Sequence, residues 1–149
     1  SEDLIQASDL AEKQAKLVRQ NSFDARRDMF LRASRFIIED LNSTAIDLNR
    51  LLDDVGSQKL WPRLARGEKG IFVKSMLQDD ARHARDVIKG KFEGDDNFRK
   101  YVQRYLDHFE RLLNEANESD PENLLSSTFL SADIGKLYLV LARSVGRLN

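Results

Sequence analysis

Hydrophobic residues in the last quarter of the chain occupy nearly every side of a predicted helix. Within residues 124–148 the only charges are Asp133, Lys136, Arg143 and Arg147, whose spacings of 3, 7 and 4 place them on one narrow stripe. A helix that is apolar over most of its circumference is buried by several neighbours or by a partner chain. The pattern therefore predicts a buried C-terminal core helix, with a bend near Ser131. The apolar positions are Leu125, Phe129, Leu130, Ile134, Leu137, Leu139, Val140, Leu141, Val145 and Leu148.

A second pattern runs along the first third of the chain. Apolar residues recur at steps of three or four through Phe30, Ala33, Ile37, Leu41, Ala45, Leu48, Leu52 and Val55. Such a seam is typical of a long helix that pairs in a dimer or lies in an elongated monomeric bundle. It predicts a helix over residues 23–55, roughly 50 Å long, which starts after a break at Asn21 and Ser22 and is capped by Gly56.

Shorter elements connect these two patterns. A loose stripe over residues 2–20 predicts a solvated leader helix, typical of the end of a longer coiled coil. Short helices are expected at 57–66, 71–78 and 81–92, the last capped by Asp79 or Asp80, and a strong amphipathic helix at 97–117 opens at Asp95 and Asp96. Asp120 and Pro121 predict the next helix start. We expect an all-α, elongated bundle of six or seven helices, with a leader at 1–21 and a single domain at 22–149.

Composition narrows the protein class. The chain of 149 residues has 33% charged and 41% hydrophobic residues, with seven Gly and two Pro, which leaves little room for the turns of an all-β fold. Cysteine is absent, so disulfides and zinc–thiolate sites are excluded and a reducing cytoplasm is expected. The chain begins with Ser1 in helical sequence, and we expect it to be a fragment of a larger protein.

The charge is unevenly distributed although its sum is −1. Residues 57–91 carry nine Lys and Arg against four Asp and Glu, and residues 92–123 carry four against nine. The basic block can pair with the acidic block within one chain or between chains. An alternative is a nucleic-acid or anionic-membrane module that uses residues 59–91, although the pI near 6.1 weakens this alternative.

Signatures of catalysis are weak. The chain lacks the GxxxxGK[ST], GxGxxG and GxSxG motifs. Asp80 and His83 approximate a metal-ligand spacing, with Asp79 and Asp86 nearby, but such a group is more typical of a capped helix start with a solvated histidine. Glu110 is expected to form an ion pair with Arg104 or Arg111. We expect no enzyme activity, no catalytic residues, no metal and no cofactor.

Two groups of residues are candidates for interaction. The first is a tentative protein-binding set in the basic block, comprising Trp61, Arg63, Arg66, Lys69 and Phe72. The second is a tentative core or self-association set, comprising Ile37, Leu41, Leu48, Leu52, Gly135, Leu137, Tyr138 and Leu141. Glycine inside a helix costs about 1 kcal/mol relative to alanine, so Gly135 indicates a close backbone approach or a local kink. The Tyr138 hydroxyl is expected to reach a polar partner.

Two stretches carry a family resemblance. NFRKYVQRYLDHFERLL at 97–113 and LLSSTFLSADIGKLYLVLA at 124–142 resemble the C-terminal region of large alphaproteobacterial coiled-coil proteins. These are often described as apolipoprotein-like or kinesin-like, and the cell-pole marker TipN looks like a member. FIIEDLNSTAIDLNRLL at 36–52 and LWPRLARGEKGIFVKSML at 60–77 fit the same pattern, so the likeness covers about residues 23–148.

The resemblance implies a cytoplasmic C-terminal domain on a coiled-coil, often membrane-tethered, scaffold that marks a cell pole or division site and recruits other proteins. It supplies no catalytic residues. We therefore expect a homodimer or higher homo-oligomer with polar or division proteins as partners, nucleic acid not among them, and membrane contact only through the parent chain.

Overall fold

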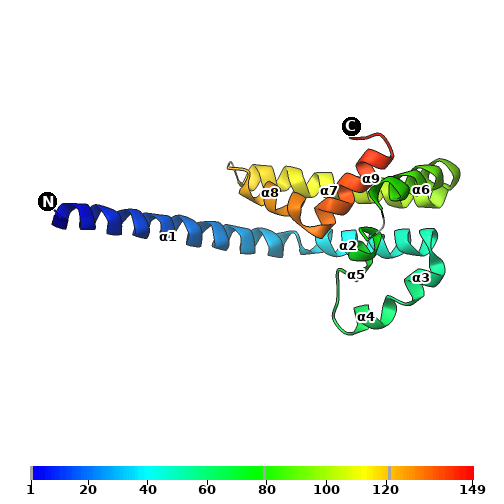
Figure 1. The fold of residues 1–149 in the computed structure, drawn as a ribbon, viewed down its shortest axis with the longest axis horizontal. Coiled ribbons are helices and arrows are strands. Elements are labelled where there is room, and N and C mark those ends of the chain that lie inside the picture. Colours follow the sequence, from blue (N-terminus) through cyan, green and yellow to red (C-terminus); the bar gives the residue numbers. More distant parts are fainter. Residues whose placement is uncertain (1, 79, 121) are drawn as a thin grey trace. The chain divides into compact units, whose positions relative to one another are not determined.

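The computed structural model describes residues 2–78, 80–120 and 122–149, which form helices joined by turns, with no strand among them. The predicted all-α helical bundle is confirmed. Two compact units divide the chain, Ser1–Arg35 and Phe36–Asn149, and each is described by itself (Figure 1). The helices are α1 Glu2–Ala33, α2 Arg35–Leu52, α3 Asp54–Gln58, α4 Trp61–Ala65, α5 Ile71–Met76, α6 Ala81–Gly94, α7 Asp96–Ser119, α8 Leu124–Ser131 and α9 Asp133–Ser144.

Helix α1 runs through the predicted break. Asn21 and Ser22 lie inside it, and the helix ends at Ala33, before a turn at Ser34. The prediction of one helix over 23–55 preceded by a break at 21–22 was therefore wrong. Asn and Ser favour caps only when the chain turns there, and here the neighbouring residues sustain the helix. The Gln20 side chain donates to Asp24 across this position at 3.2 Å, a contact between residues four apart that stabilises helices.

The C-terminal end of the predicted 23–55 helix also differs from the observed one. Helix α2 ends at Leu52, and Asp53 caps a new short helix by accepting a hydrogen bond from the Gly56 backbone N–H at 2.9 Å. Gly56 is thus inside α3 rather than the cap of α2. A Cβ on Gly56 would lie 2.2 Å from Asp53 Oδ2, so the tight cap uses the space that glycine leaves.

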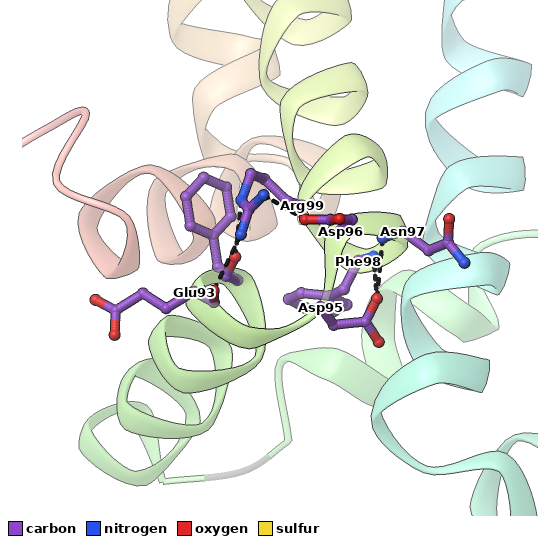
Figure 2. A network of polar contacts seen from close by, with 7 residues as sticks. Glu93, Asp95, Asp96, Asn97, Phe98 and Arg99 are labelled. Atoms are coloured by element: carbon purple, nitrogen blue, oxygen red, sulfur yellow. Dashed lines mark hydrogen bonds and ion pairs between the residues drawn. The ribbon is translucent and has the colours of Figure 1, made fainter.

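The corner between α6 and α7 is built from caps at both helix ends (Figure 2). Asp95 accepts hydrogen bonds from the backbone N–H groups of Asn97 and Phe98 at 2.9 and 3.1 Å, which confirms it as the predicted start of the helix. Arg99 reaches back from α7 and donates to the carbonyls of Phe92 and Glu93, each at 3.0 Å. Orphan groups at the end of one helix and the start of the next are therefore satisfied together. The backbone bonds to Asp95 also lower the pKa of its carboxyl.

Helix α7 is the centre of the second unit. It packs against α6, α8 and α9, and α9 also contacts α5, α6 and α8. Its inward face follows the predicted amphipathic pattern and is fully buried at Phe98, Val102, Tyr105, Leu106, Phe109 and Leu112. Burial raises the pKa of Tyr105, whose hydroxyl donates to the carbonyl of Ile134 at 2.7 Å. This bond ties α7 to the start of α9.

The predicted C-terminal core helix is present and bent. Helices α8 and α9 meet at Ala132 at an angle of 75°, close to the expected bend at Ser131. Leu125, Phe129, Leu137 and Leu141 are buried, but Leu148 lies beyond the helix and is exposed. No single described helix is long and apolar enough to span a membrane, and only this bent pair reaches the needed length and composition when taken together.

The start of α8 differs from the predicted one. Asp120 follows α7, and its carboxylate accepts from the N–H groups of Glu122 and Leu125 at 3.2 and 2.7 Å. The helix itself begins at Leu124 after Asn123, which has a positive φ of 60°. Asp120 therefore caps the helix from four residues before it, and the Pro121 part of the prediction lies outside the described residues.

Candidate protein interface

Trp61 is the first residue of α4. It lies on a small projection that consists of α3, α4 and the turn before α5 (Figure 1). Its side chain is 43% exposed, whereas Phe72 on α5 is only 1% exposed. The two rings meet edge to face with centroids 5.2 Å apart, a favourable geometry for aromatic pairs. Pro62 lies at the first turn of α4, where proline is tolerated because that N–H has no helical partner. The result is an exposed indole held against a buried ring.

Three basic residues follow Trp61 in the same segment of the chain, Arg63, Arg66 and Lys69. Arg63 donates to both carboxylate oxygens of Glu68, at 2.8 and 3.0 Å, and this fork lowers the pKa of Glu68. Arg66 and Lys69 are exposed and form no ion pair among the described residues. The bidentate Arg63–Glu68 pair bridges the turn after α4, and Arg66 and Lys69 are exposed cations of the same turn.

A buried asparagine ties α2 to α5, the helix against which Trp61 packs. The Nδ2 atom of Asn49 donates to the carbonyl of Ala45 in its own helix and to the carbonyl of Phe72 on α5, each at 2.7 Å. The second bond joins residues 23 positions apart. It fixes the backbone of the residue whose ring supports Trp61.

A groove of about 450 Å³ lies next to the projection, between the end of α2 and helices α3, α5 and α6. Leu52, Met76, Val87 and Ile88 line it together with polar side chains that include Asp53 and His83. His83, which the sequence analysis considered with Asp80 as a weak metal-ligand pair, is one of the residues that line this groove. Asp80 caps α6 through the Arg82 N–H at 3.2 Å, Asp79 lies outside the described residues, and no group of three metal-ligating side chains occurs in the described part of the chain.

The five residues of the tentative protein-binding set lie within residues 61–72, but they are not equivalent. Trp61, Arg63, Arg66 and Lys69 are exposed. Phe72 belongs to the core, so it supports the surface rather than forming it. Periodicity around residue 72 was too short to separate these roles, because α5 has only six residues.

The core or self-association set lies mostly inside the second unit. Leu41, Leu48, Leu137 and Leu141 are completely buried, and Ile37 and Leu52 are half-buried. These leucines stabilise the monomer's own core. A Cβ on Gly135 would lie 2.1 Å from the carbonyl oxygen of Phe129, so the expected close backbone approach is confirmed, and the approaching segment is α8 across the bend.

Tyr138 stacks on Phe109 with centroids 4.7 Å apart, and its hydroxyl donates to Glu110 Oε2 at 2.8 Å. The predicted polar partner of Tyr138 is therefore confirmed. Arg147 binds the other oxygen of Glu110 at 2.9 Å and Asp107 at 3.0 Å. Burial and the bond to Glu110 raise the pKa of Tyr138 to about 12.

The expected partners of Glu110 were wrong, because Arg104 and Arg111 bind elsewhere. Arg111 pairs with Glu115 at 3.2 Å, and Arg104 donates through Nε to Asp40 of α2 at 3.1 Å. His108 Nδ1 lies against the same Asp40 carboxylate without hydrogen-bond geometry. The hydrogen bond from Arg104 lowers the pKa of Asp40. Asp40 and Arg104 are 64 positions apart, and no sequence signal connects them.

Few charges of the basic block pair with the acidic block. Lys91 and Asp95 form an ion pair at 3.4 Å where the two blocks meet. Arg82, Arg85 and Lys89 are exposed on α6 and form no ion pair within the described residues. The side chains of these three residues are therefore accessible to an anionic partner.

No protein-family model, curated protein or solved structure matches this chain.

Proposed function

We propose that this chain is a non-enzymatic protein-interaction and self-association domain of a coiled-coil scaffold that acts in the cytoplasm at a cell pole or division site. The observation that carries the interaction part is the exposed Trp61, which packs edge to face on Phe72 and is followed within eight residues by the exposed Arg66 and Lys69. The scaffold, the location and the class of partner follow from the family resemblance of residues 23–148.

Trp61 has the properties of a binding anchor. Tryptophan and arginine are enriched among the residues that dominate interface energies. The indole already packs on Phe72, whose backbone carbonyl accepts a hydrogen bond from Asn49. It therefore loses little side-chain entropy on binding. The matching partner surface has an apolar pocket for the indole and carboxylates for Arg66 and Lys69.

The test compares two charge-reversed variants. Arg66→Glu with Lys69→Glu changes the surface beside Trp61, and Arg85→Glu with Lys89→Glu makes the same charge change on α6. Crosslinking in the source cell, followed by identification of the captured proteins, measures partner binding, and a fluorescent fusion measures localisation. We expect Arg66→Glu with Lys69→Glu, and also Trp61→Ala, to lose the partner and the fluorescent focus at the cell pole. The variant with the changes on α6 should keep both. Equal retention by all three would contradict the proposal.

The exposed cations of α6 support a second candidate, a nucleic-acid or anionic-membrane module. Binding of that kind depends on the summed positive charge and falls steeply with salt. Both charge-reversed variants would then weaken binding to DNA or to phosphatidylserine vesicles by similar factors, and Trp61→Ala would retain most of it. The same three variants therefore distinguish the two functions.

A further inference from the structure

The groove between α2, α3, α5 and α6 differs in charge from the basic block that supplies most of its walls. None of the described residues that line it is Lys or Arg, although residues 57–91 carry nine. Asp53 lines it, Asp54 follows directly, and Asp80 lies one turn before the lining residue Ala84, whose N–H donates to the Asp80 carbonyl at 2.8 Å. All three carboxylates are exposed, and within the described part of the chain none of them has an ion-pair partner. The rim of the groove is therefore acidic.

The walls of the groove are apolar and partly open to water. Val87 of α6 is 42% exposed, Leu52 of α2 is half-buried, and Met76 and Ile88 complete the apolar lining. The volume of about 450 Å³ lies within the roughly 300–1,000 Å³ of pockets that hold small ligands. The groove is therefore large enough for one aromatic side chain, with carboxylates at its rim for neighbouring cations.

We propose that this groove binds the Trp61 projection of a second copy of the chain. The partner surface that Trp61 requires has an apolar pocket and carboxylates, and the groove has both. Arg66 and Lys69 are exposed and have no carboxylate partner among the described residues, while the carboxylates at the rim have no cation. Each copy thus supplies the charge that the other lacks, and such complementarity selects the partner. The inference rests on the proposed binding role of Trp61 and on self-association, and it names the partner and the surface.

The contact is expected to be reciprocal. Helix α3 belongs to the projection and also contributes Gly56 and Ser57 to the groove, so the two features are adjacent. A two-fold dimer brings the same patch of both copies together, and each copy then inserts Trp61 into the groove of the other. A one-way contact would leave a projection and a groove unfilled at the ends, and the assembly would grow with concentration.

Two single variants test the contact from its two sides. Trp61→Ala removes the inserted side chain, and Val87→Arg narrows the groove and adds a cation to it. Each is expected to raise the dimer Kd by about thirtyfold or more, the effect of losing a residue that dominates an interface. Leu124→Arg is the matched control, because Leu124 is 43% exposed and does not line the groove. It should leave the Kd unchanged.

Sedimentation of the purified chain across a range of concentrations measures the dimer, and circular dichroism at 222 nm checks that each variant is folded. A chain that stays monomeric, or a dimer that Val87→Arg does not weaken, would overturn the inference. Growth of the wild type beyond a dimer would overturn the reciprocal arrangement.

Mixing the two variants tests the exchange itself. Trp61→Ala keeps its groove and Val87→Arg keeps its indole, so one of the two contacts can form between them. The mixture should therefore dimerise more strongly than either variant alone and more weakly than the wild type. A mixture that gains nothing would show that Trp61 and the groove do not bind each other.

Trp61 is the only tryptophan of the chain, so its fluorescence reports the contact directly. Its emission should shift to shorter wavelength as the dimer forms, because the indole leaves water. A dimer that forms without this shift would overturn the inference. The cellular capture experiment is read separately. A monomeric purified chain whose Trp61→Ala variant still loses its partner in the cell would contradict the second copy as the partner and leave the interaction part of the proposed function intact.

Discussion

Gly135 permits the bend on which the C-terminal core depends. Its Cα faces the last turn of α8, where an added Cβ would meet the Phe129 carbonyl at 2.1 Å and Leu130 Cα at 2.7 Å. Both are backbone atoms, which cannot move aside as the end of a flexible side chain can. The cost of glycine in a helix is accepted here because any larger residue would open the corner between α8 and α9.

Gly135→Ala should therefore destabilise the protein by roughly 1–3 kcal/mol, although alanine is the better helix former. Gly90→Ala is the matched control, since Gly90 lies inside α6 with nothing within 4 Å of the added Cβ. That change should stabilise by about 0.5–1 kcal/mol. Denaturant unfolding of both variants gives the comparison, and stabilisation by both would contradict the close approach at Gly135.

Tyr138 makes stability depend on pH in the alkaline range. Its pKa is raised to about 12 in the folded protein, against about 10 for an unfolded tyrosine. Between these values the unfolded chain releases the phenolic proton and the folded chain keeps it, so the free energy of unfolding falls as pH rises. The contribution of Tyr138 is complete below pH about 10 and is lost as pH rises through about 12.

Tyr138→Phe should remove part of this decline. At neutral pH the variant should be less stable by about 1 kcal/mol, because the hydrogen bond to Glu110 is lost. Denaturant unfolding at several pH values between 7 and 12 measures both effects. If the wild type and the variant lose stability equally over the alkaline range, Tyr138 is not the titrating group.

At the scale of elements, the short helices around Trp61 depend on α2 for their position. Asn49 donates to the Phe72 carbonyl, and α3 begins at the cap that Asp53 forms. Neither five-residue helix, α3 or α4, is long enough to be stable alone. Their arrangement comes from these caps and from the Trp61–Phe72 contact.

Asn49→Ala should lower the free energy of unfolding by about 1–3 kcal/mol, because the buried Phe72 carbonyl loses a donor. Asn42→Ala is the matched control. Asn42 is also on α2 and donates only to the Ile38 carbonyl of its own helix, so its loss should cost less than about 0.5 kcal/mol. The fluorescence of Trp61 reports directly on the surroundings of the indole. An unchanged emission spectrum in Asn49→Ala would show that the hydrogen bond from Asn49 to Phe72 does not position the indole.

At the scale of the whole molecule, the second unit depends on a core shared by α7 and α9. Leu137 has no exposed surface, and Leu124, on the neighbouring α8, is 43% exposed. A carboxylate at position 137 would be buried without a partner, at a cost that is a large part of the usual 5–15 kcal/mol of folding free energy.

Leu137→Asp should therefore unfold the second unit, and Leu124→Asp should leave it folded. Circular dichroism and a thermal melt distinguish the two variants. A cooperative transition near the wild-type Tm in Leu137→Asp would contradict the core position of this residue.

Much of the fold was predictable because its signals are local. The apolar circumference of 124–148, the face of α7, and the caps at Asp80 and Asp95 each involve residues within one or a few helical turns. Backbone N–H groups at a helix start require an acceptor within about three residues, so a short window of sequence contains the whole signal. The bend at Ala132 and the close approach at Gly135 were predictable for the same reason.

Other features depended on contacts between distant residues. Asp40 binds Arg104 from 64 positions away, and Asn49 binds Phe72 from 23 positions away. The predicted break at Asn21 and Ser22 is not used, and α1 ends instead at Ala33, before the turn at Ser34. Several local signals can compete, and long-range packing decides which of them is used.

The sequence alone determined the helical class, the buried C-terminal segment and the caps at Asp80 and Asp95, because hydrophobic periodicity and backbone hydrogen bonding act over short distances. Only the tertiary structure decided that the exposed Trp61 packs on a buried Phe72, and that Glu110 binds Tyr138 and Arg147 instead of its neighbours on α7. The physical reason is that a side chain's exposure and its charge partners depend on which other helices pack beside it.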